Sequence, residues 1–213
     1  RVALARALVT EPTVLLLDEP LSNLDAKLRA EMQVEIRRIQ RELKITTIIV
    51  THDQEEAVSI ADRVIVMNSG KILQMGKPRE IFDRPTNLFV ADFMGFTNFI
   101  DGKVIKAEGT NVRVACSGRE LIVTDINNTG FVPGDEVILA IRPENIKPEG
   151  KDSENALTGT VKNITYKGTV TRVEIKDIFD KTVFVDINDD DSFQVGGAIT
   201  VAFPSQKLLI YKK

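Results

Sequence analysis

Two adjacent acidic residues, Asp18 and Glu19, follow an aliphatic run in the segment VLLLDEP, residues 14–20. In open α/β sheets, ligands bind at the carboxyl ends of strands, where two carboxylates are unfavourable unless they face a cation or water. Asp18 is therefore placed to support Mg²⁺ through a coordinated water. Glu19 is placed to accept a proton from, or to orient, a water that attacks a γ-phosphate. The alternative is that Asp-Glu-Pro is only a turn or helix start.

The next segment, LSNLD, is by itself a capping motif. It spans Leu21–Asp25 and comes directly before a predicted helix that begins at Ala26. On their own, Ser22 and Asp25 are residues that could each cap that helix.

The segment Thr51-His52-Asp53 is the third candidate, and it contains the only histidine of the chain. At a strand end beside a phosphate, His52 could hydrogen-bond the γ-phosphate and the attacking water. The alternative is that His52 only helps to cap the following helix. Asp53 with Glu56 three residues later predicts a capping box at that helix start.

Strands and helices that could position these residues alternate in the first part of the chain. Continuous aliphatic runs at Val14–Leu17 and Thr47–Val50 predict strands buried on both faces. Residues 26–43 place apolar side chains on one helical face. A hairpin is expected across 64–75, and further helices at 1–8, from Asp53 to about Ala61, at 78–83 and at 87–94.

After residue 95 the pattern changes to short strands and turns, which predicts a small β barrel or sandwich. The polar stretch Pro143–Asn155 is expected to be a loop between its two halves. Strands are expected at 99–106, 111–115, 120–124, 136–142, 157–166, 169–176, 182–187, 198–203 and 207–211.

The order of the three polar segments along one α/β stretch resembles the ATP-binding subunits of ABC transporters. The similar text is LLLDEPLSNLDAKLR followed by TTIIVTHDQEEAVSIADRVIVMNSGKILQMGKPREIFDRP. RVALARAL resembles the helix that follows the family's LSGGQ signature. FVADFMG, AIRPENI and YKGTVTRVEI resemble the TOBE regulatory domain of importer ATPases for maltose, polyamines, ferric iron and related solutes.

The resemblance implies a role for each segment. Asp18 would assist Mg²⁺ through water, Glu19 would be the general base and His52 would hold the γ-phosphate of ATP. The D-loop would consist of Ser22, Asn23, Leu24 and Asp25, and would communicate across a dimer of ATPase subunits.

The implied architecture is α/β followed by all-β. Residues 1–95 would be the C-terminal part of a P-loop ATPase domain with a parallel sheet, and residues 96–213 an OB-like TOBE barrel. Transmembrane permease subunits would be direct partners and a solute-binding protein an indirect one. The protein would lie in the cytoplasm, peripherally on the inner face of the cell membrane.

The sequence departs from the family pattern because the P-loop, the Q-loop and the LSGGQ tract are missing from it. The P-loop supplies the backbone N–H groups and the lysine that hold phosphates. We therefore expect an N-terminally truncated chain that by itself neither binds ATP tightly nor hydrolyses it. The missing segments should also leave apolar sheet surface exposed, so the chain should dimerise, swap or be disordered there.

Bulk composition bears on the classes of partner that the chain could bind. The 213 residues are 43% hydrophobic and 28% charged with a net charge of −3, which argues against a nucleic-acid partner. The sequence does not reveal the transported solute. The alternative function is a regulatory, dimerising or solute-sensing β module with a non-catalytic N-terminal remnant.

Overall fold

The computed structural model describes residues 2–125, 129–148, 153–188 and 193–213. The chain divides into two compact units, Arg1–Thr86 and Asn87–Lys213. The sequence places the boundary after residue 95 instead. The difference arises because Ala91, in the helix that precedes Gly95, packs with Phe96, Ala140 and Leu209 of the second unit.

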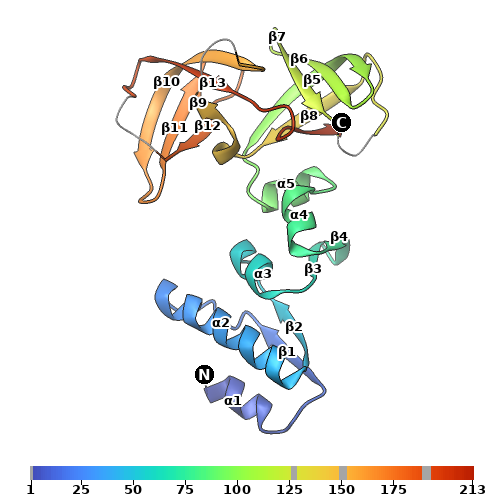
Figure 1. The fold of residues 1–213 in the computed structure, drawn as a ribbon, viewed down its shortest axis with the longest axis vertical. Coiled ribbons are helices and arrows are strands. Elements are labelled where there is room, and N and C mark those ends of the chain that lie inside the picture. The colour runs from blue at the N-terminus through green and yellow to red at the C-terminus, as the bar shows by residue number, and fades with distance from the viewer. Residues whose placement is uncertain (1, 126–128, 149–152, 189–192) are drawn as a thin grey trace. The chain divides into compact units, whose positions relative to one another are not determined.

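The first unit is α/β (Figure 1). Its elements are α1 (Val2–Leu8), β1 (Val14–Asp18), α2 (Ala26–Leu43), β2 (Thr46–Val50), α3 (Gln54–Ile60), β3 (Val64–Asn68), β4 (Lys71–Gly76) and α4 (Pro78–Asp83).

Strands β1 and β2 pair in parallel, in a register that sets Asp18 opposite Val50. Because the pairing continues to the last residue of both strands, their carboxyl ends coincide. The backbone N–H of Glu19 extends the pairing by donating to the carbonyl of Val50 at 2.9 Å. The polar segments that follow the two strands therefore start at one edge of the sheet.

Helix α2 connects β1 to β2 along the chain and covers one face of the strand pair. Its buried residues Met32 and Ile36 cluster with Leu21 and Ile60, and Leu17 and Ile49 of the strands pack against them. The apolar face predicted for residues 26–43 is therefore buried over the central part of the helix. Its last member, Leu43, is 55% exposed.

The opposite face of β1 and β2 is open, so the prediction of strands buried on both faces is wrong for the described chain. The exposed side chains are large and apolar: Val14 47%, Leu16 71%, Ile48 54% and Val50 56%. The expectation that apolar sheet surface would be exposed is confirmed for this face. The antiparallel hairpin β3–β4 has exposed apolar side chains as well: Ile65, Met67, Ile72 and Met75.

The second unit is all-β apart from short helices. Its elements are α5 (Leu88–Phe93), β5 (Asn98–Glu108), β6 (Asn111–Cys116), β7 (Arg119–Thr124), β8 (Glu136–Ile141), η1 (Pro143–Asn145), β9 (Lys147–Pro148), β10 (Ala156–Tyr166), β11 (Thr171–Lys176), β12 (Val183–Ile187), β13 (Ala198–Ala202) and β14 (Leu209–Lys212).

In the part of the chain that the structure describes, these strands form two antiparallel sheets of order β14-β8-β5-β6-β7 and β12-β11-β10-β13-β9 (Figure 1). Both sheets contribute to one core, which includes Leu121 and Leu139 from the first and Ile175 and Val201 from the second. The predicted fold class, α/β followed by an all-β OB-like unit, is therefore confirmed.

The predicted loop Pro143–Asn155 is partly wrong. It begins with the short helix η1, continues through the fully buried Ile146, and reaches β9, which pairs with β13. Residues 149–152 of that segment lie outside the described residues. Among the helices of the described chain, none is both long enough and apolar enough to cross a bilayer.

Candidate functional site

Glu19 and His52 meet at the shared carboxyl edge of β1 and β2. Nδ1 of His52 lies 3.1 Å from Oε1 of Glu19, and the two side chains are 72% and 49% exposed. Because an ionised carboxylate only accepts hydrogen bonds, a hydrogen bond here requires the histidine tautomer that carries its proton on Nδ1. The two predicted catalytic residues are thus brought together from positions 33 residues apart.

The backbone of Glu19 adopts an uncommon conformation. Its φ of 43° is in the left-handed region, which costs energy for a residue with a side chain. The following residue is Pro20, which further restricts the backbone before it. Strained conformations of this kind persist where the surroundings fix them, often at functional sites.

Hydrogen bonds hold Glu19 in this conformation at both of its peptide groups. Its N–H donates to Val50, and its carbonyl accepts from the hydroxyl of Ser22 at 3.0 Å and from the N–H of Ser22 at 3.3 Å. Ser22 therefore fixes Glu19 and does not cap α2. The carboxylate of Glu19 projects from a backbone that is fixed on both sides.

Asp25 is the residue that caps α2. Its Oδ1 accepts from the N–H of Leu28 at 3.0 Å, and the buried Leu21 anchors the start of the turn. Asn23 is exposed and Leu24 is half-buried. The capping interpretation is thus correct for Asp25, while Ser22 and Asn23 leave an exposed polar surface next to Glu19.

The segment of His52 is held by its neighbours. Oδ1 of Asp53 caps α3 by accepting from the N–H groups of Glu55 and Glu56. The predicted capping box is wrong in its second half, because the Glu56 carboxylate accepts from the Thr51 hydroxyl at 2.7 Å and the Asp53 N–H donates to Thr51 Oγ1. Since Asp53 makes the cap, the ring of His52 remains available to Glu19.

Asp18 ends β1 and is exposed beside Glu19. Its carboxylate is an oxygen ligand of the kind that hard cations take. Over the described ranges, no group of three or more His, Cys, Asp or Glu side chains is arranged to hold a metal ion by itself. A cation at Asp18 would need further ligands from water or a substrate.

Arg29 is the residue at this site that the sequence does not single out. It lies in the first turns of α2 and contacts both the carbonyl of Leu24 and the carboxylate of Asp53. An arginine four residues after an N-cap is ordinary in a helix, so no sequence signal distinguishes it.

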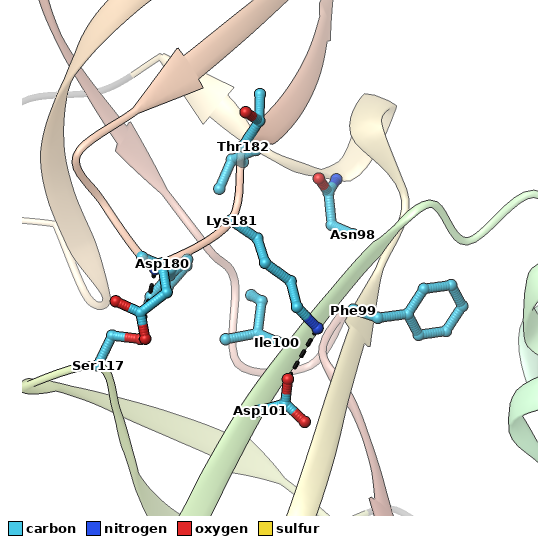
Figure 2. Close-up of a pocket in the computed structure, with 10 residues that line it drawn as sticks. Asn98, Phe99, Ile100, Asp101, Ser117, Asp180, Lys181 and Thr182 are labelled. Carbon is cyan, nitrogen blue, oxygen red and sulfur yellow. Dashed lines mark hydrogen bonds and ion pairs between the residues drawn. The ribbon is translucent and has the colours of Figure 1, made fainter.

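The second unit contains a small cavity between β5 and the loop that precedes β12 (Figure 2). Its volume of about 40 Å³ has room for only a few waters. Lys181 reaches across it to Asp101 at 2.7 Å, and Lys213 also pairs with Asp101. These two lysines lower the pKa of Asp101 to about 2. Because the cavity is this small and its lysine is paired with Asp101, it does not favour the solute-sensing alternative.

Comparisons with known proteins agree across both units. A family model described as a TOBE domain matches residues 139–210. The spermidine/putrescine import ATP-binding protein PotA of Ruegeria pomeroyi is 46% identical over 97% of this chain and 56% of its own length. The protein of the same name from Pseudomonas fluorescens is 41% identical over 99% of this chain and 58% of its own. The chain thus spans little more than half the length of these relatives.

Two solved structures are also similar. The cytoplasmic molybdate-binding protein ModG aligns with 54% of this chain and 95% of its own, with a TM-score of 0.41 and 18% identity. CbiO1 of Clostridium perfringens, part of the ABC transporter complex cbiONQ, aligns with 39% of this chain and 33% of its own. Its TM-score is 0.37 and its identity is 42%.

Proposed function

We propose that the chain belongs to the ATP-binding subunits of ABC importers that have a TOBE domain, and that residues 14–53 form the hydrolytic half of an ATPase site. The similarity to the import ATP-binding proteins and the TOBE match support this proposal. The intact protein would couple ATP binding and hydrolysis to solute uptake. The observation that supports this most is the 3.1 Å contact between Glu19 and His52 at the end of two parallel strands.

Glu19 is the proposed general base. It accepts a proton from the water that attacks the γ-phosphate, and its fixed backbone together with the contact to His52 restricts where the carboxylate lies. His52 orients Glu19 through Nδ1. The other ring nitrogen, Nε2, can accept from the attacking water, or donate to the γ-phosphate when the ring is protonated.

Asp18 is the proposed partner of Mg²⁺. That ion commonly binds through one or two carboxylates together with waters and substrate phosphates, so a single exposed carboxylate at a strand end fits it. When bound, the ion supplies charge neutralisation to the phosphate oxygens. Asp18 would hold it through a water.

Phosphate binding requires a segment that this sequence does not contain. No G-x-x-x-x-G-K-[ST] segment is present in the 213 residues, and that segment supplies the backbone N–H groups and lysine that hold phosphates. We therefore propose that the chain on its own does not hydrolyse ATP. In the intact protein, Ser22–Asp25 would face a second ATPase subunit, and the pair would act on permease subunits at the inner face of the membrane.

Polyamines are the proposed solutes, because the relatives described above are named for spermidine and putrescine import. Uptake of labelled spermidine, putrescine and maltose would be measured in cells that lack the gene encoding this stretch. We expect spermidine and putrescine uptake to be lost, maltose uptake to continue, and the intact gene to restore both polyamines. Restoration by a Glu19→Gln gene, or loss of maltose uptake alone, would contradict the proposal.

A further inference from the structure

We infer that Arg29 is a positioning residue that joins the Ser22–Asp25 turn to the segment of His52, so that both keep one geometry relative to the substrate. The inference rests on the proposed ATPase function and adds a residue to it. Arg29 touches neither Glu19 nor His52 in the contacts described above, so any effect on hydrolysis must pass through the segments that it joins.

The guanidinium of Arg29 faces three acceptor residues in two segments, the Ser22–Asp25 turn and the start of α3. Nη2 donates to the carbonyl of Leu24 at 3.1 Å, and Nη1 donates to Oδ2 of Asp53 at 3.4 Å. Nε is buried and lies 3.9 Å from Oε1 of Glu56. At this distance the two side chains form an ion pair but no hydrogen bond. The planar fork presents a different nitrogen to each of the three residues and donates hydrogen bonds to two of them, whereas the ammonium of a lysine is a single point of charge.

The two carboxylates that Arg29 faces, those of Asp53 and Glu56, are themselves fixed to the segment of His52. Asp53 uses Oδ1 to cap α3 and Oδ2 to meet Arg29, so one carboxylate connects the two helices. Glu56 is only 3% exposed and accepts from Thr51. Burial of a charged carboxylate is costly without a partner, and Arg29 is the cation next to it.

His52 lies between residues that this network holds, Thr51 and Asp53. Its own ring is largely exposed, and its described contact is the one with Glu19. The orientation of the ring therefore depends on the two residues beside it. On the other side of Arg29, the bond to Leu24 holds the end of the turn whose Ser22 fixes the Glu19 carbonyl. One side chain thus connects the supports of both proposed catalytic residues.

The test uses Arg29→Gln and Arg29→Lys in the intact ATPase, with Arg38→Gln as the control. Arg38 lies on the same helix, is 52% exposed and pairs with Glu35 and Glu42. We expect kcat to fall by roughly 10- to 100-fold in both Arg29 variants, as for misplaced catalytic groups, while KM for ATP changes by less than about threefold. Recovery of kcat by Arg29→Lys would show that charge alone suffices and would overturn the inference.

Two further measurements separate this inference from the proposed function. Because His52 is the only histidine, its imidazole signals in the NMR spectrum of the 213-residue chain need no residue assignment. Arg29→Gln should shift or broaden them and Arg38→Gln should not; unmoved signals would overturn the inference. If the intact wild-type protein has no ATPase activity that depends on Glu19, the proposed function fails, but the NMR result still decides the role of Arg29.

Asp53→Asn provides a second variant if Arg29→Gln does not fold. Asparagine is as good an N-cap as aspartate, so α3 keeps its cap while Arg29 loses its charged acceptor. The expected result is again a fall in kcat with little change in KM. A wild-type kcat in this variant would overturn the inference.

Discussion

At the residue scale, Glu19 shows how a local conformation serves a proposed catalytic group. Its φ of 43° before Pro20 is unfavourable in isolation. Bonds to Val50 and Ser22 hold it, and the result is a carboxylate that meets His52. The position of Glu19 at the end of an aliphatic strand thus determines where its carboxylate lies as well as supplying a charge.

Cys116 allows a pH prediction at the same scale. Burial, and to a smaller extent the charge of Asp101, raises the pKa of its thiol to about 12. In the unfolded chain the thiol ionises near pH 8.5. The stabilisation from keeping the thiol neutral is therefore complete below that pH and is lost as the pH rises toward 12.

The urea midpoint should accordingly fall between pH 7 and pH 10 by more in the wild type than in Cys116→Ala. Native Cys116 should also react with a thiol reagent at least ~10²-fold more slowly than the unfolded chain, because reaction requires opening of the core. Labelling of the native protein at the rate of a free thiol would contradict the burial on which this prediction depends.

The residues of the candidate site were easier to propose from the sequence than their local partners. Asp18, Glu19 and His52 could be proposed because their order along the chain is informative even where each segment alone is ambiguous. Arg29 could not be found, because its contacts depend on how α2 and α3 pack. Glu56 was assigned to the wrong donor because spacing alone cannot distinguish the N–H of Asp53 from the hydroxyl of Thr51.

At the element scale, the strands of the second unit were predictable because turn residues and alternation bound them. The short strand β9 was missed because two residues, one of them proline, show no periodicity. The aliphatic runs of β1 and β2 correctly predicted strands. They could not indicate that one face would be open, since the composition of a strand does not say which segment covers it.

Gly159 in β10 provides a stability prediction for an element. A Cβ there would lie 2.5 Å from the carbonyl oxygen of Lys176 and 2.6 Å from side-chain carbons of Ile175 and Ile178. The neighbouring backbone belongs to a paired strand and the following turn and cannot easily move. Gly159→Ala should therefore lower the free energy of unfolding of the second unit by about 1–3 kcal/mol, measured by urea denaturation.

Gly109→Ala is the matched control for this prediction. It adds the same methyl group at a turn where nothing lies within 4 Å, and the positive φ there costs about 1–2 kcal/mol. The crowding at Gly159 should in addition perturb β10 itself, seen as faster amide exchange at its pairs with β11 and β13. Unchanged exchange and unchanged stability in Gly159→Ala would show that the sheet accommodates the methyl group.

At the scale of the whole molecule, the two units differ in how much of their apolar surface is covered. The second has one continuous core formed by both of its sheets. The first exposes large apolar side chains on β1, β2 and the β3–β4 hairpin. The relatives are almost twice as long as the aligned stretch. We propose that further chain in the intact protein covers these faces and supplies the phosphate-binding segment.

The most direct test of the proposed ATPase function is the rate of ATP hydrolysis by Glu19→Gln in the intact protein. Glutamine keeps the shape of the side chain but cannot accept a proton, so kcat should fall by roughly 10²–10⁴-fold, while ATP binding stays within a few-fold of the wild type. The matched control is Glu42→Gln, an exposed carboxylate on α2 that pairs with Arg38. A Glu19→Gln protein that keeps more than about a tenth of the wild-type kcat would contradict the assignment of residues 14–53 as the hydrolytic half of the site.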